Sequence, residues 1–177
     1  MANISRSIKF LRIVVISTIT LLSISQFWFW LAPYSFEFIS FDYPLLDEIG
    51  GIKALNGKQK LLGFFITAIP MATLIWSLIL LMKLTKILAA GKWFDKLCED
   101  YCNQVGRWLV IYVILNILHR TVLVTAVTMD NPPGARHFTI SFSTDDLMAL
   151  VPAIFALIIG HMVRLAREKQ DELNEII

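Results

Sequence analysis

The chain has 177 residues, of which 56% are hydrophobic and only 17% are charged, and its mean hydropathy is +0.66. A water-soluble domain of this length cannot cover so much apolar surface, so these values exclude that class and indicate an integral membrane protein. The formal net charge of +2 is small. We therefore expect no direct nucleic-acid binding.

Four apolar runs along the chain are each long enough to cross the hydrocarbon of a bilayer, which takes about 20 helical residues. Because a spanning segment in lipid must satisfy its own backbone hydrogen bonds, each run is predicted to be an α-helix. The expected fold is an all-α membrane protein, a four-transmembrane-helix bundle that forms a single domain over residues 1–177. The predicted spans are residues 13–31, 61–82, 108–129 and 147–163.

Basic residues are distributed unequally between the segments that flank these spans. Eleven of the 16 Lys and Arg residues lie in the N-terminal arm, the central loop and the tail, and four lie in the other two loops. Cytoplasmic segments carry the excess of basic residues, so both termini are predicted to be cytoplasmic, in an N-in/C-in arrangement.

The two predicted outer loops each contain an alternation of aromatic and polar residues that is typical of a short β-strand. The alternation runs from Tyr34 to Phe38 in the first loop and from Phe138 to Phe142 in the second. We expect these β-like segments to pair and to cover the outer end of the bundle.

Pro70 lies in the middle of the second span, where it removes a backbone donor and clashes with the preceding turn, so a helix kink is predicted there. Beyond this span, the apolar residues between Leu84 and Tyr101 fit an amphipathic helix that lies along the lipid surface and is broken at Gly91. The central loop is thus expected to be partly helical as well as basic.

The third span contains the candidate ligand-binding residues. Asn116, His119 and Arg120 share one helix face, and counting along the span places them near the bilayer centre. An arginine at that depth costs about 2.5 to 3.5 kcal/mol on insertion scales, so it needs a counter-charge. The sequence leaves several partners open: a bound anion, a lipid headgroup, water, or the side chain of Asp145, Asp146 or Glu37.

A structural interpretation of the same residues stands beside the ligand-binding one. In it, Arg120 snorkels outward to Asp145 or to a lipid phosphate, while Asn116 and His119 hydrogen-bond to neighbouring helices.

The start of the fourth span carries residues with a predicted structural capping role. Ser143 and Asp146 have the spacing of a capping box, and Asp145 and Asp146 lie near the positive end of the helix dipole. We therefore assign Ser143, Asp145 and Asp146 to helix capping before any ligand role.

Residues that could hold a metal or act in catalysis are few. Cys98 and Cys102 are four residues apart on a helix, but two ligands do not complete a tetrahedral site, and His161 is the one nearby third ligand that the sequence offers. The sequence has no nucleophile elbow, zinc-protease motif or paired intramembrane carboxylates. We predict no metal, no cofactor and no enzymatic activity.

Several short motifs lie at the borders of the spans from Leu61 onward. They are Leu61-Leu62-Gly63-Phe64, Gly91-Lys92-Trp93-Phe94, Asn131-Pro132-Pro133-Gly134, Ser141 to Leu147, and the charged tail Arg167 to Glu172. On these motifs, which are spread over about two thirds of the chain, the sequence resembles a bacterial membrane family, domain of unknown function twenty-nine seventy-five. The resemblance implies a four-pass protein of the bacterial cytoplasmic (inner) membrane, sometimes encoded beside a small helix-turn-helix regulator. It implies no catalytic residues.

The expected function is that of a non-enzymatic sensor, regulatory or accessory protein of the inner membrane. Its expected partners are membrane lipid and a cytoplasmic protein that contacts the central loop and the tail, residues 165–177. The alternative is a small transporter or binder of an anionic or amphiphilic ligand at the intramembrane site formed by Asn116, His119 and Arg120. No oligomeric state is predicted.

Overall fold

The computed structural model describes residues 2–31, 55–91, 93, 95–129 and 144–176. These residues form four helices, namely α1 (Ala2–Leu31), α3 (Gly57–Ala89), α4 (Lys96–Thr128) and α5 (Thr144–Ile176). All four helices are long and apolar enough to cross a membrane, so the chain is an all-α membrane protein, as its composition predicts. The β-like segments predicted in the two outer loops lie outside the described residues.

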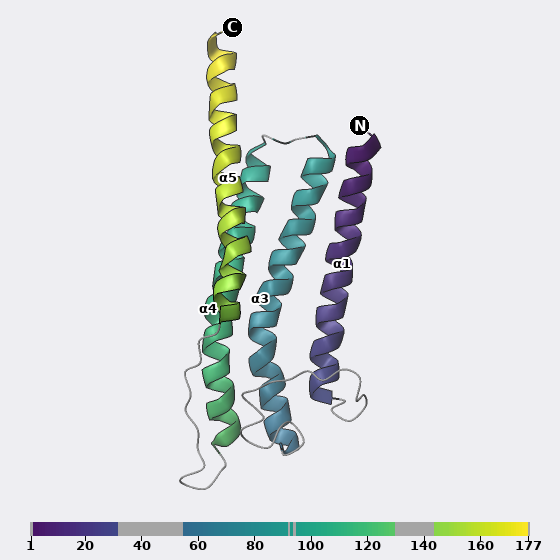
Figure 1. The fold of residues 1–177 in the computed structure, drawn as a ribbon, viewed down its shortest axis with the longest axis vertical. Helices are drawn as coiled ribbons and strands as arrows, with labels where there is room; N and C mark the ends of the chain where they lie inside the picture. Colours follow the sequence, from purple (N-terminus) through teal and green to yellow (C-terminus); the bar gives the residue numbers. More distant parts are fainter. Residues whose placement is uncertain (1, 32–54, 92, 94, 130–143, 177) are drawn as a thin grey trace.

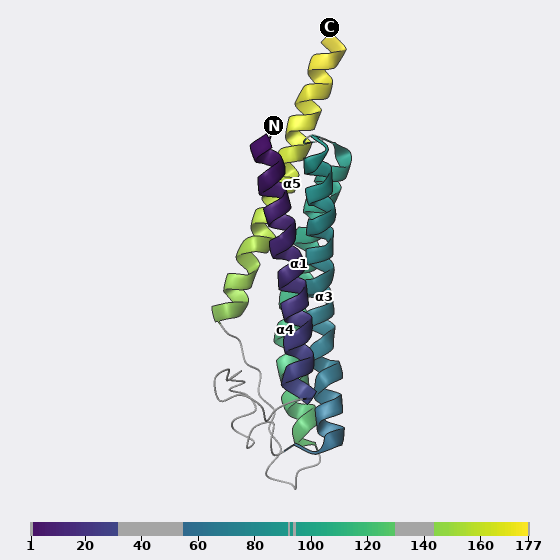
Figure 2. The same ribbon diagram turned by 90° about the vertical axis from the view of Figure 1, so that its right-hand side faces the viewer.

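The helices pack in the order of the sequence, with α1 against α3, α3 against α4, and α4 against α5. Figure 1 shows α1, α3 and α4 side by side with α5 lying over α4, and Figure 2 shows α5 inclined to the other helices. The start of α1 and the end of α5 lie at the same end of the bundle, which we call the terminal end. We call the opposite end, where α1 ends and α3 begins, the Trp30 end.

The stretch from residue 84 to 101 is a helical hairpin, and not a helix that lies along the lipid surface. Gly91 adopts a φ of 75° just beyond α3, and Asp95 begins α4 by accepting a hydrogen bond from the Leu97 N–H at 3.3 Å. The prediction of a surface helix is wrong because residues 84–89 and 96–101 are the ends of α3 and α4, and most of their apolar side chains pack against neighbouring helices, although Trp93 and Leu97 are exposed. The buried cluster consists of Leu84, Cys98 and Cys102, with Leu81, Ile87, Leu88, Tyr101 and Val163 packed against it.

A second buried cluster, formed by Trp30, Leu55 and Leu123, closes the Trp30 end. The Trp30 Nε1 donates a hydrogen bond to the Thr67 Oγ1 at 2.9 Å, which fixes the end of α1 on α3. A Cβ atom at Gly63 would overlap the Trp30 indole, so the glycine is what lets the ring lie directly on the α3 backbone. Tryptophan at this position thus joins two helices as well as filling the cluster.

Candidate functional site

The contact between Arg120 of α4 and Asp146 of α5 is the centre of the candidate site. The Arg120 Nη1 donates to the Asp146 Oδ2 at 3.3 Å, and the Arg120 Nη2 lies 3.3 Å from the Asp146 Oδ1. The Asp146 side chain is completely buried, whereas that of Arg120 is 19% exposed. A buried carboxylate must be paired and hydrogen-bonded to be stable, so this two-point contact supplies the counter-charge that the sequence left open.

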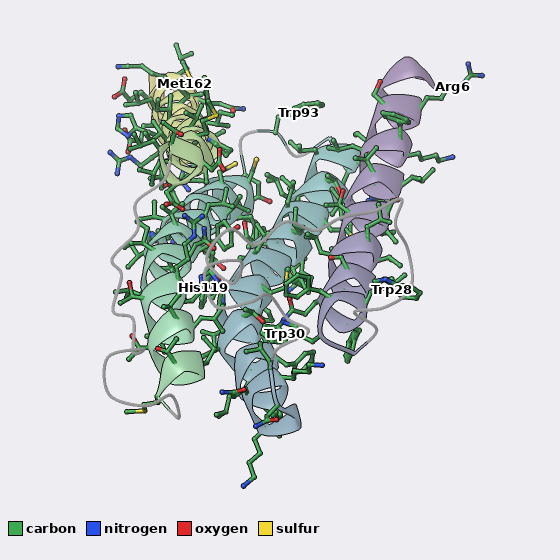
Figure 3. All side chains as sticks on the ribbon, turned by 60° about the horizontal axis from the view of Figure 1, so that its bottom comes forward. Arg6, Trp28, Trp30, Trp93, His119 and Met162 are labelled. Carbon is green, nitrogen blue, oxygen red and sulfur yellow. The ribbon has the colours of Figure 1, made fainter. Side chains whose placement is uncertain are left out.

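The two other predicted site residues lie beside this ion pair. The Asn116 Nδ2 donates to the Asp146 Oδ1 at 2.9 Å. His119 is buried, and its Nδ1 lies 2.7 Å from the Asn116 carbonyl oxygen, so we assign the ring proton to Nδ1. Figure 3 shows His119 on the side of α4 that faces α3. The structure therefore brings all three predicted residues together, with Asp146 as the fourth member of the group.

Asp146 lies in the first turn of α5, where its carboxylate also meets the positive end of the helix dipole. Asp145 is in the same turn but is exposed. Ser143 lies outside the described residues, so the capping box stays a prediction. Asp146 does more than begin a helix, because its carboxylate joins α5 to α4.

The packing of α3 against α4 shows which part of α3 lies level with Arg120. The rings of Trp76 on α3 and Trp108 on α4 are neighbours, with centroids 6.4 Å apart. Because antiparallel helices advance equally along their axes, the middle of the apolar run 61–82 lies opposite Val113, and Arg120 lies about 10 Å closer to the Trp30 end. The position of Arg120 relative to a bilayer stays a prediction, and an arginine near the edge of the hydrocarbon would cost less than one at its centre.

A second ion pair joins the same two helices at the terminal end. The Arg167 Nη2 of α5 lies 3.1 Å from the Glu99 Oε2 of α4, and the two side chains are 25% and 13% exposed. This carboxylate oxygen is buried and accepts no hydrogen bond within the described part of the chain, so its contact with Arg167 is an ion pair only. The α4–α5 interface is thus bounded by an ion pair at each end.

Residues at this interface recur every seven positions on both helices. The series are Glu99, Gly106, Val113 and Arg120 on α4, and Asp146, Ala153, Gly160 and Arg167 on α5. Each series begins with an acid and ends with an arginine, so in an antiparallel pair the acid of one helix meets the arginine of the other. A seven-residue repeat is the pattern of closely aligned helices with interlocking side chains. Our sequence reasoning missed this repeat, although the spacing is visible in the chain.

Close approach of the two helices depends on the glycines of this repeat. A Cβ atom on Gly106 would lie 2.6 Å from the Leu157 Cγ, and one on Gly160 would lie 2.5 Å from the Asn103 Oδ1. A side chain at either position would require the facing Leu157 or Asn103 side chain to move, so each glycine favours the close approach of the helices. Together with the ion pairs, they fix how far α5 is shifted along α4.

Pro70 and the cysteines are the remaining predicted features. Pro70 is buried within α3, which stays a single helix on both sides of it, and the kink remains a prediction. Cys98 and Cys102 are buried thiols, whereas His161 is exposed. Among the described residues no group of three or more His, Cys, Asp or Glu side chains is placed to hold a metal ion.

The fold defines the class of this chain as a membrane protein with four candidate spanning helices. No family model, no curated protein and no solved structure matches the sequence. The resemblance to domain of unknown function twenty-nine seventy-five therefore stays a prediction.

Proposed function

We propose that the protein is a non-enzymatic sensor, regulatory or accessory protein of a bacterial inner membrane, which acts by contact with a cytoplasmic protein. The observation that carries the proposal is the projection of α5. This helix runs without a break from the turn that holds the buried Asp146 to a segment that extends beyond the ends of the other three helices (Figures 1 and 2). A continuous helix can join an element packed in the bundle to a contact surface outside the bundle.

The projecting segment begins after the last contact between α5 and α4. The Arg167–Glu99 pair marks that contact, and the next charged residues pair within α5, as in the 2.6 Å contact of Lys169 with Glu172. Leu173 is 62% exposed on this segment. An isolated helix that shows an apolar side chain among charges is a suitable surface for a partner protein.

The charges of the segment indicate the chemistry of that partner. Beyond Arg167, the carboxylates of Glu168, Asp171 and Glu172 outnumber the single amine of Lys169. Electrostatic complementarity therefore favours a partner with a basic contact surface. We propose that this partner lies in the cytoplasm, because the excess of basic residues in the N-terminal arm, the central loop and the tail favours a cytoplasmic position for both termini.

The alternative function, a small transporter or binder, was motivated by an arginine without a counter-charge. The two-point contact of Arg120 with Asp146 supplies that charge within the chain. The Asn116 amide satisfies the same carboxylate. The group is therefore complete without an anionic ligand, which supports the contact function over the ligand-binding one.

Site-specific photocrosslinking in cells tests the proposal. A photoreactive residue in place of Leu173 is expected to give one discrete protein adduct, and the same residue in place of the lipid-exposed Phe155 is expected to give none. Reversal of the nearby acids, in Glu168→Lys, Asp171→Lys and Glu172→Lys together, should abolish the adduct. An adduct that survives the charge reversal, or the absence of any adduct, would contradict the proposed contact.

A further inference from the structure

Charge is segregated between the two halves of the bundle. Neither α1 nor α3 contains an acidic residue, although each carries several basic ones. Five of these cations lie at the terminal end, on the first turns of α1 and the last turns of α3: Arg6, Lys9, Arg12, Lys83 and Lys86. Within the described part of the chain, none of the five is ion-paired.

The ion pairs that the structure describes all lie in the other half of the bundle. They join α4 to α5 or link residues within α5, as in Arg120–Asp146 and Arg167–Glu99. The cations of α1 and α3 have no acidic residue on their own helices. A concentration of like charge on two packed helices attracts anions from the surroundings.

Arg12 is the member of this group whose position is fixed. Its Nε donates a hydrogen bond to the Thr85 Oγ1 at 3.3 Å across the α1–α3 contact. Thr85 is almost completely buried, and its hydroxyl donates in turn to the Met82 carbonyl oxygen at 2.7 Å. The hydroxyl thus uses its proton on Met82 and its lone pair on Arg12. The two terminal amino groups of Arg12 form the fork that suits a phosphate.

Two exposed lysines lie on the same stretches of helix as this guanidinium. Lys9 lies one turn before Arg12 on α1, and Lys86 follows Thr85 on α3. Figure 3 shows Arg6, one turn before Lys9, projecting away from the helices. On the face of α1 that carries Arg12, Ile16 is one turn further into the apolar run and is 52% exposed. A basic site one turn from exposed apolar surface matches a molecule that is anionic at one end and hydrocarbon at the other.

Two lysines follow the apolar run 61–82 at this end of α3. The Lys83 Nζ lies 5.8 Å from the centroid of the Trp76 ring, and Lys86 is one turn further along the helix. Lysines that flank an apolar span extend toward the headgroup level of a bilayer. The positions of Lys83 and Lys86 therefore suit contact with lipid phosphates.

We propose that the cationic terminal end of α1 and α3 binds the headgroup of an anionic phospholipid, with the Arg12 guanidinium on the phosphate and Lys9 and Lys86 around it. The exposed apolar surface of α1 selects the lipid over free phosphate, because only the lipid brings acyl chains to cover that surface. This site does not depend on the protein contact proposed for α5.

Native mass spectrometry of the detergent-solubilised full chain tests the site, with phosphatidylglycerol and phosphatidylcholine titrated separately. The wild-type chain should retain phosphatidylglycerol in preference to phosphatidylcholine. Arg12→Gln/Lys86→Gln should bind phosphatidylglycerol about 25-fold more weakly, at about fivefold for each cation lost near an anionic headgroup. The matched control is Lys58→Gln/Lys60→Gln, which removes two lysines from the opposite end of α3 and should keep the preference.

A second variant and a competition measurement distinguish a specific lipid site from misfolding, from free-phosphate binding and from an effect of overall charge. Lys9→Gln/Lys86→Gln keeps the Arg12–Thr85 contact and therefore leaves the packing of α1 on α3 in place. This variant should bind phosphatidylglycerol more weakly, which tests the site even if the Arg12 variant does not fold. Inorganic phosphate at millimolar concentration should not displace the lipid, and displacement would overturn the assignment to a phospholipid. Equal losses in the variants of both ends would show that only overall charge matters, and would overturn the site.

Discussion

Removal of the Arg120 charge tests whether the Arg120–Asp146 pair holds α5 to α4. In Arg120→Leu, a completely buried carboxylate loses both guanidinium contacts and keeps the Asn116 amide and the field of the helix terminus. Breaking a buried pair by removal of one partner costs about 3 to 5 kcal/mol. The two interactions that remain offset about 1 kcal/mol of that cost or somewhat more, so we expect a loss of about 2 to 3 kcal/mol in the free energy of unfolding.

Asp146→Leu and the double variant complete a thermodynamic cycle. The Arg120 side chain is 19% exposed, so without Asp146 it can turn toward water or a lipid phosphate, and we expect a smaller loss of about 1 kcal/mol. The double variant leaves no carboxylate buried. It should therefore lose less than Arg120→Leu alone.

Equilibrium unfolding in mixed detergent micelles, followed by tryptophan fluorescence, measures these free energies. Arg107→Leu is the matched control, because Arg107 is an exposed arginine of the same helix for which the described residues supply no ion pair; its effect should stay below about 0.5 kcal/mol. If the loss in the double variant equals the two single losses added together, the pair has no coupling energy and the reasoning is refuted.

Two further predictions concern glycines. Gly106→Val should destabilise the protein by about 1 to 3 kcal/mol in the same assay, because its side chain would meet Leu157, whereas Gly57→Ala, whose Cβ would enter open space, should have little effect. An equal response of the two variants would show that α4 and α5 do not approach closely at Gly106. Gly91→Ala should cost about 1 kcal/mol because the backbone there has a φ of 75°, and an unchanged stability would argue against that turn.

The four helices could be predicted from the sequence because each is an apolar run of sufficient length. The ends of the helices could not be predicted, because the flanking residues are amphipathic and fit either a surface helix or a continuation of the span. Packing decides between a surface helix and a continued span. Leu84 buries against Cys98 and Cys102, and this contact between segments on either side of a turn makes the two segments the ends of α3 and α4.

The candidate site was predicted in part. The shared face of Asn116, His119 and Arg120 follows from helical spacing alone. Which residue pairs with Arg120 could not be predicted from spacing, because the partner lies on another helix. The pairing depends on how far α5 is shifted along α4. The level of α4 along α3, which the contact of Trp76 with Trp108 sets, could not be predicted for a related reason.

The seven-residue repeat shows why this shift has one value. Glu99 and Asp146 lie in the first turns of their helices, where a carboxylate is favoured by the helix dipole, and each also meets an arginine of the neighbouring antiparallel helix. A displacement of α5 by one turn would separate both ion pairs at once and would move both glycines off their close contacts. Arg120 and Arg167 are therefore both engaged in holding the register of α5 on α4. The five terminal-end cations of α1 and α3 have no ion pair among the described residues, which leaves them available to the anionic lipid that we propose for that end.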